Sequence, residues 1–192
     1  MANQKMTKAE KSWIVYDVGN SALVLLATSV IPIYFSSLSP EGGVVVAWSW
    51  AETVASLIIA LLMPVLGSIA DMQGMKKRFI VGCVGTGVVA TLAMGFVTTA
   101  LAFLVIYVIS SVALNSSMVF YDALLVDTTT DERMDEISSQ GYAWGYIGSC
   151  VPFIACLGVV LGYEALGITL QTAMQIAFAI TGLWWAAFTV PL

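Results

Sequence analysis

Six long apolar stretches, separated by short clusters of charged and turn-forming residues, dominate this chain of 192 residues. Each has about the 17–25 residues, or slightly more, that an α-helix needs to cross the hydrocarbon core of a membrane. A membrane β-barrel would instead show segments of about ten residues alternating between apolar and polar side chains. The sequence lacks that alternation, so we predict an all-α membrane protein with six transmembrane helices. The predicted spans cover residues 13–38, 44–66, 79–97, 101–126, 138–162 and 170–192.

The composition supports a chain solvated by the lipid bilayer. It is 59% hydrophobic and 10% charged, with a mean hydropathy of +0.93, whereas soluble domains carry about 25% charged residues. No basic surface indicates nucleic acid. The sequence has no histidine, no Cys/His ligand spacing, no phosphate-binding loop and no nucleophile–base constellation. We therefore expect no enzyme activity, no metal site and no cofactor.

The basic residues predict the orientation in the membrane. All of them fall on one side of a six-helix alternation, and positively charged loops stay in the cytoplasm. We therefore predict a cytoplasmic tail at residues 1–12, a membrane bundle at 13–192, and two cytoplasmic termini. The apolar stretch after the basic N-terminus is too long for a signal peptide. The seven cations are Lys5, Lys8, Lys11, Lys76, Lys77, Arg78 and Arg133.

Polar side chains form stripes inside two of the apolar stretches. In 13–38 they recur at helical offsets of three and four, and in 101–126 at offsets of four and seven, so each set shares one helix face. The simpler interpretation of the amides and hydroxyls is hydrogen bonding between helices. Ionisable groups within a span are costly and usually face the bundle interior or a water-filled cavity. The predicted substrate or coupling-ion residues are Asp17, Asn20, Ser21, Glu52, Asn115, Asp122 and Trp144.

Small residues and aromatic residues predict how the helices pack. Gly141 and Gly145 form a GxxxG pair, which allows close approach of another helix backbone. Trp13 lies near the predicted cytoplasmic face, where tryptophan side chains often anchor a helix at the interface.

The segment GSIADMQGMKKR, residues 67–78, joins the second and third stretches. Gly67 is expected to allow close helix packing, Gly74 a turn with positive φ, and Asp71 a cap or an ion pair. The pattern resembles the cytoplasmic loop signature of the major facilitator superfamily, although Met72 and Met75 replace two of its usual basic residues. The resemblance implies a gating motif made of Gly67, Asp71, Gly74, Lys76, Lys77 and Arg78, with Asp127 as one possible partner.

The first stretch carries a second resemblance. Residues 13–35 are similar to the first helix of vacuolar-effluxer-like permeases, a group related to an autophagy-linked amino-acid exporter of yeast vacuoles. The matching residues are Tyr-Asp-x-x-Asn-Ser-Ala at 16–22 and Pro-x-Tyr-Phe at 32–35, and the runs 120–123 and 137–149 also resemble that group. Sugar–cation symporters are a neighbouring alternative, since they too place aspartates in comparable helices.

These resemblances imply a secondary transporter that works by alternating access. Its fold would contain two three-helix repeats, and its substrate would be a small polar metabolite such as an amino acid, with proton coupling through Asp17 or Asp122. Such transporters have two six-helix bundles, so we expect a second bundle from the same gene, a partner chain or a second copy. We expect a bacterial inner membrane protein. The alternative is a membrane scaffold or sensor subunit that does not transport.

Overall fold

A computed structural model describes residues 5–39 and 43–192 of the chain, and these residues contain helices and no strand. Residues 1–4 of the predicted N-terminal tail lie outside the described residues. The helices are α1 (Lys8–Ser29), α2 (Ile31–Leu38), α3 (Val44–Ala70), α4 (Lys76–Met94), α5 (Ala100–Thr128), the 3-10 turn η1 (Asp131–Arg133), α6 (Met134–Leu161) and α7 (Leu170–Thr189).

The helices are long and apolar, as an all-α membrane bundle requires. Four helical segments, α3, α4, α5 and η1 with α6, are each long and apolar enough to cross a membrane. The helices α1 and α2 are bent by 45° and together make a fifth candidate span. Pro32 stands in the first turn of α2, where it lacks the N–H that would continue the α1 hydrogen-bond ladder. The helical membrane fold is confirmed, whereas the sixth crossing, over α7, stays a prediction.

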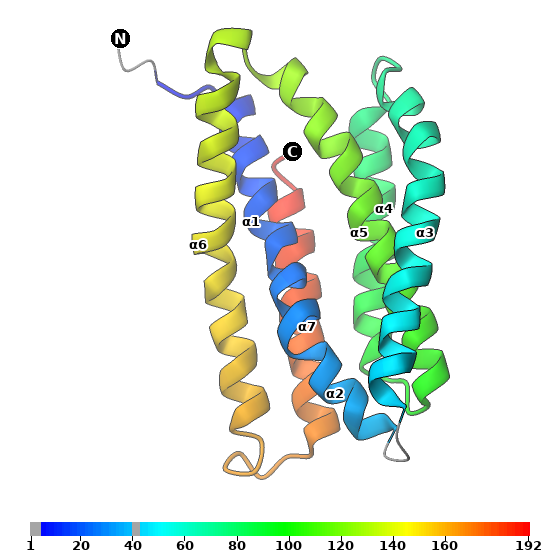
Figure 1. The fold of residues 1–192 in the computed structure, drawn as a ribbon. Coiled ribbons are helices and arrows are strands. Elements are labelled where there is room, and N and C mark those ends of the chain that lie inside the picture. The colour runs from blue at the N-terminus through cyan, green and yellow to red at the C-terminus, as the bar shows by residue number, and fades with distance from the viewer. Residues whose placement is uncertain (1–4, 40–42) are drawn as a thin grey trace.

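The bundle consists of two groups of helices (Figure 1). In one group, α1 packs against α6 and α7, and in the other, α5 packs against α3 and α4. Exchanging α1, α3 and α4 with α5, α6 and α7 reproduces the contacts of the central helices α1 and α5, whereas α6 also packs against α7 and α3 has no comparable contact with α4 within the described residues. The contacts of the central helices agree with the two three-helix repeats that the resemblance implies.

The α1–α6 contact depends on glycines that face α1. A Cβ at Gly141 would lie 2.5 Å from Trp13 Cζ3, and one at Gly148 would lie 2.5 Å from Val18 Cγ1. Carbon atoms normally approach to about 3.5–4.0 Å. The backbones of α1 and α6 therefore approach so closely that only glycine fits at these positions, as the small-residue pattern predicts.

Trp13 is part of the core. It is 3% exposed, stacks on Tyr121 with ring centroids 4.3 Å apart, and donates from Nε1 to the Tyr121 carbonyl at 3.0 Å. The predicted interfacial anchor is therefore wrong, because this ring joins α1 to α5 and fills the space above Gly141.

The cations gather at one end of the bundle. The start of α1, the start of α4 and the turn η1 lie at this end, as does the end of the chain at Leu192 (Figure 1). We call it the basic end. Helices α2, α4 and α6 end at the opposite end of the bundle.

Helix α1 begins five residues before the predicted span. A capping box causes this early start, because the Thr7 hydroxyl accepts from the Glu10 N–H at 3.2 Å and Glu10 Oε2 accepts from the Thr7 N–H at 2.7 Å. Residues 8–12 of the predicted tail are therefore helical.

Candidate functional site

Asp17 lies on α1, against the backbone of α6. Its carboxylate is buried, and Oδ1 accepts from Asn20 Nδ2 at 3.3 Å. A Cβ at Gly145 would lie 2.4 Å from Asp17 Oδ2 and 3.2 Å from Ser21 Oγ. The structure thus brings together Asp17, Asn20 and Ser21, as their spacing predicts, and Gly145 makes room for them.

Asn20 also connects this group to α5. Its amide donates to Met118 Sδ at 3.0 Å, and one turn earlier the Tyr16 hydroxyl donates to Ser117 Oγ at 2.8 Å. These contacts fix the position of α1 beside α5. The polar faces of the two central helices consequently meet.

Asp122 lies on α5 and its side chain is exposed in this bundle. Within residues 5–39 and 43–192 it makes no ion pair and no side-chain hydrogen bond, and Asp17 has no cationic partner either. From helix rise, Asp17 lies about 13 Å from the start of α1 and Asp122 about 9 Å from the end of α5. Both therefore stand in the half of the bundle nearer the basic end.

Tyr121 adds a polar group that sequence reasoning did not select. Its ring is buried between Trp13 and Tyr16, and its hydroxyl has no hydrogen-bond partner among the described residues. A buried hydroxyl without a partner is costly.

Glu52 does not join this group. It lies about 12 Å from the start of α3 by helix rise, nearer the opposite end, and accepts a hydrogen bond from the Tyr107 hydroxyl on α5. Trp48 covers this pair, with its ring centroid 4.4 Å from that of Tyr107. The predicted set is therefore divided into two layers of the bundle.

Asn115 and Trp144 complete the predicted set. The Asn115 amide donates to the Ser111 carbonyl of its own helix at 2.8 Å, as expected for the simpler, structural interpretation of an amide in a span. Trp144 is 52% exposed and precedes Gly145 on α6. Neither side chain contacts Asp17 through a hydrogen bond among the described residues.

The loop between α3 and α4 uses its cations in different ways. Lys76 pairs with Asp127 at 2.7 Å and donates to the Ala123 carbonyl at 3.0 Å. Lys77 donates to the Leu192 carbonyl. Arg78 makes no ion pair and no hydrogen bond to the rest of the described chain.

The structure confirms the expectation for one glycine of this loop and contradicts it for the other. Gly74 has a φ of +74°, which confirms the expected turn. A Cβ at Gly67 would meet no atom within 4 Å, so the expected close packing at Gly67 does not occur within the described bundle. The Asp71 N–H donates to the Gly67 carbonyl at 3.2 Å, while the Asp71 carboxylate makes no ion pair in this part of the chain.

A buried ion pair at the basic end was missed from the sequence. Glu10 is 1% exposed and accepts from Arg133 at 2.8 Å and from the Thr129 hydroxyl at 2.7 Å. Burial opposes its ionisation, but the Thr7 N–H, the Thr129 hydroxyl and the Arg133 charge together hold the pKa of Glu10 below its usual range. The Thr-x-x-Glu spacing was the available signal, although it indicates a helix start and no tertiary partner.

The fold defines a polytopic, all-helical membrane protein. The vacuole effluxer Atg22-like family model matches residues 125–192. An uncharacterized MFS-type transporter, YxiO of Bacillus subtilis strain 168, is 38% identical over 98% of this chain and 46% of its own length. None of the solved structures matches the chain.

These matches confirm the resemblance to major facilitator transporters. They also indicate a transporter family and not an enzyme family. The chain spans about half the length of the curated relative that it matches.

Proposed function

We propose that the chain forms one half of a secondary active transporter that works by alternating access. The observation that carries the proposal is the pair of unneutralised carboxylates, Asp17 and Asp122, on the central helices of the two groups. Ionisable residues in spans usually line a substrate or ion path. Tyr121, next to Asp122 in the sequence, has a buried hydroxyl without a hydrogen-bond partner among the described residues, which we propose as a further polar contact.

A second six-helix bundle is the proposed partner of this face. The relative YxiO is about twice as long as the matched region. Gly67 has open space around its Cβ position, and the nearby Asp71 carboxylate is unpaired among the described residues. A second bundle, from the same gene, a partner chain or a second copy, would use both features to close the gating loop.

The proposed substrate is a small polar metabolite, with amino acids as the first class to test. The effluxer-like match favours export, and the resemblance of residues 13–35 to vacuolar-effluxer-like permeases is the reason to test amino acids before the substrates of sugar–cation symporters. Proton coupling is proposed through Asp17 or Asp122, because a carboxylate at that depth gains from being protonated when water leaves the site. The basic end is proposed to face the cytoplasm of a bacterial inner membrane.

Counterflow in proteoliposomes tests the proposal. The full reading frame containing this chain is reconstituted with a mixture of radiolabelled amino acids, with and without a pH gradient. Asp17→Asn and Asp122→Asn should each reduce exchange at least tenfold or abolish its dependence on pH. Asp135→Asn is the matched control, since Asp135 is exposed at the start of α6.

Two results would count against the proposal. Exchange by both aspartate variants with an unchanged pH dependence would remove the carboxylates from the mechanism. Absence of exchange by the natural sequence for every labelled amino acid, with or without the gradient, would favour the scaffold or sensor alternative.

A further inference from the structure

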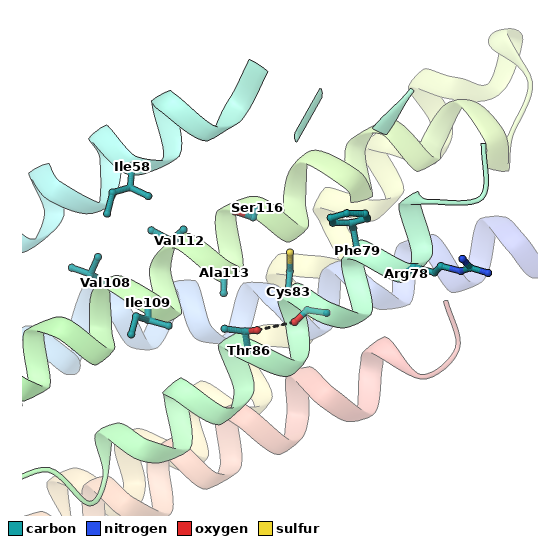
Figure 2. A pocket seen from close by; sticks show the side chains of 11 residues that line it. Ile58, Arg78, Phe79, Cys83, Thr86, Val108, Ile109, Val112, Ala113 and Ser116 are labelled. Atoms are coloured by element: carbon teal, nitrogen blue, oxygen red, sulfur yellow. Dashed lines mark hydrogen bonds between the residues drawn. The ribbon is translucent and has the colours of Figure 1, made fainter. Parts of the chain in front are cut away.

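An apolar groove runs along α5 between α3 and α4, and neither Asp17 nor Asp122 lines it. It encloses about 650 Å³. Its walls include Phe79 and Thr86 of α4, Val108 and Ile109 of α5, and Ile58 of α3 (Figure 2). The Thr86 hydroxyl donates to the Gly82 carbonyl at 3.0 Å, so this hydroxyl is already hydrogen-bonded and the groove can accept an apolar ligand.

The groove is long enough to hold a lipid acyl chain. Arg78 stands at its basic end, and Thr86, eight residues further along α4, lies about 12 Å deeper by helix rise. Val108 and Ile109 of α5 continue the groove beyond Thr86 (Figure 2). A single acyl chain that starts at the basic end would therefore have apolar walls through the nearer leaflet, which is about 15 Å thick.

Arg78 gives the groove a charged mouth. Lys76 and Lys77 of the same loop are engaged by Asp127 and by the Leu192 carbonyl. The Arg78 side chain is exposed and makes no ion pair within residues 5–39 and 43–192. A guanidinium binds phosphate oxygens through two parallel hydrogen bonds, and basic pockets between membrane helices recognise anionic headgroups.

We infer that this groove is a binding site for an anionic phospholipid. One acyl chain occupies the groove, and its phosphate pairs with Arg78. Asp17 and Asp122 do not line the groove, so the inference holds whether or not the chain transports amino acids, although Arg78 also belongs to the loop 67–78 that resembles the gating motif.

Native mass spectrometry of the detergent-purified product of the full reading frame tests the site. The chain is titrated with phosphatidylglycerol and, in parallel, with phosphatidylcholine of the same acyl chains. We expect tighter binding of phosphatidylglycerol. Arg78→Gln should weaken it about five- to tenfold, because one cation near the headgroup is worth about 1 kcal/mol or somewhat more. Lys8→Gln is the charge control, since Lys8 is an exposed cation on α1.

A second variant tests the groove itself. A Cβ at Gly82 or at Gly85 would meet no atom within 4 Å, but only Gly82 lines this groove. Gly82→Leu should weaken binding of both lipids, and Gly85→Leu, the matched control, should not. Circular dichroism and gel filtration confirm that each variant is folded.

The site is disproved by either of two results. Equal losses in Arg78→Gln and Lys8→Gln would show attraction to net charge alone. Unchanged lipid binding in folded Gly82→Leu would show that no acyl chain occupies the groove. Another protein chain would then be the better candidate for its occupant.

Discussion

The substitution Gly148→Ala tests the packing of α1 on α6. The new Cβ would lie 2.5 Å from Val18 Cγ1, 3.0 Å from Cγ2 and 3.3 Å from Cβ. A valine in a helix has one strongly preferred χ1 rotamer, so Val18 cannot rotate away and the two backbones must separate. Overpacking of this kind lowers the free energy of unfolding by about 1–3 kcal/mol. The better helix propensity of alanine raises it by at most about 1 kcal/mol.

The matched control is Gly158→Ala on the same helix. A Cβ at Gly158 would meet no atom within 4 Å, so this variant measures helix propensity alone. Unfolding in mixed micelles with increasing SDS should show Gly148→Ala less stable than Gly158→Ala by about 2 kcal/mol. Adding Val18→Ala to Gly148→Ala should recover part of the loss, because it removes the clashing methyl groups.

The reasoning is refuted if the two glycine variants change the free energy of unfolding equally. It is also refuted if Val18→Ala adds its full cost to Gly148→Ala. Either result would mean that α1 and α6 are not in the close contact described.

Three further predictions concern the basic end. Arg133→Gln should lower the free energy of unfolding by about 3 kcal/mol, because the Glu10 carboxylate stays buried without its cation. In the same micelle titration the control Lys8→Gln should change the free energy of unfolding by less than about 0.5 kcal/mol. The lowered pKa of Glu10 means that its stabilisation is present above its unfolded value of 4.5 and is lost as pH falls through the folded pKa. A plot of stability against pH should therefore flatten below pH 4.5 in Glu10→Gln, and an unchanged slope would contradict this. Gly74→Ala should cost about 1 kcal/mol, because a φ of +74° disfavours a side chain, whereas Gln73→Ala should be neutral; equal thermal unfolding of the two would be against the strained turn.

The helices were predictable because charged clusters mark where the chain leaves the membrane. Hydropathy locates the part of a helix that lies in lipid, however, and not its last hydrogen bond. Helices α1, α4 and α6 consequently begin three to five residues before the predicted spans, at Lys8, Lys76 and Met134. The bend at Val30 was also missed, although Pro32 was visible in the sequence.

The candidate site was predictable where it depends on one helix. The offset of three between Asp17 and Asn20 places both on one face, and the structure shows their hydrogen bond. Contacts between helices needed the tertiary arrangement. Nothing in the spacing of Glu52 indicates Tyr107, which comes 55 residues later, and nothing around Glu10 indicates its burial against Arg133.

Water accessibility of the polar face is the most direct test of the central claim, that Asp122 faces a transport path. In a background without the three native cysteines, Asp122→Cys and Val81→Cys are exposed to a membrane-impermeant methanethiosulfonate in vesicles. Val81 is 63% exposed on α4 and lies about 8 Å from the start of that helix, a depth close to that of Asp122. We predict fast modification at position 122 and little at position 81. Equal protection of both positions would contradict the account, because position 122 would then face lipid or protein and no aqueous path.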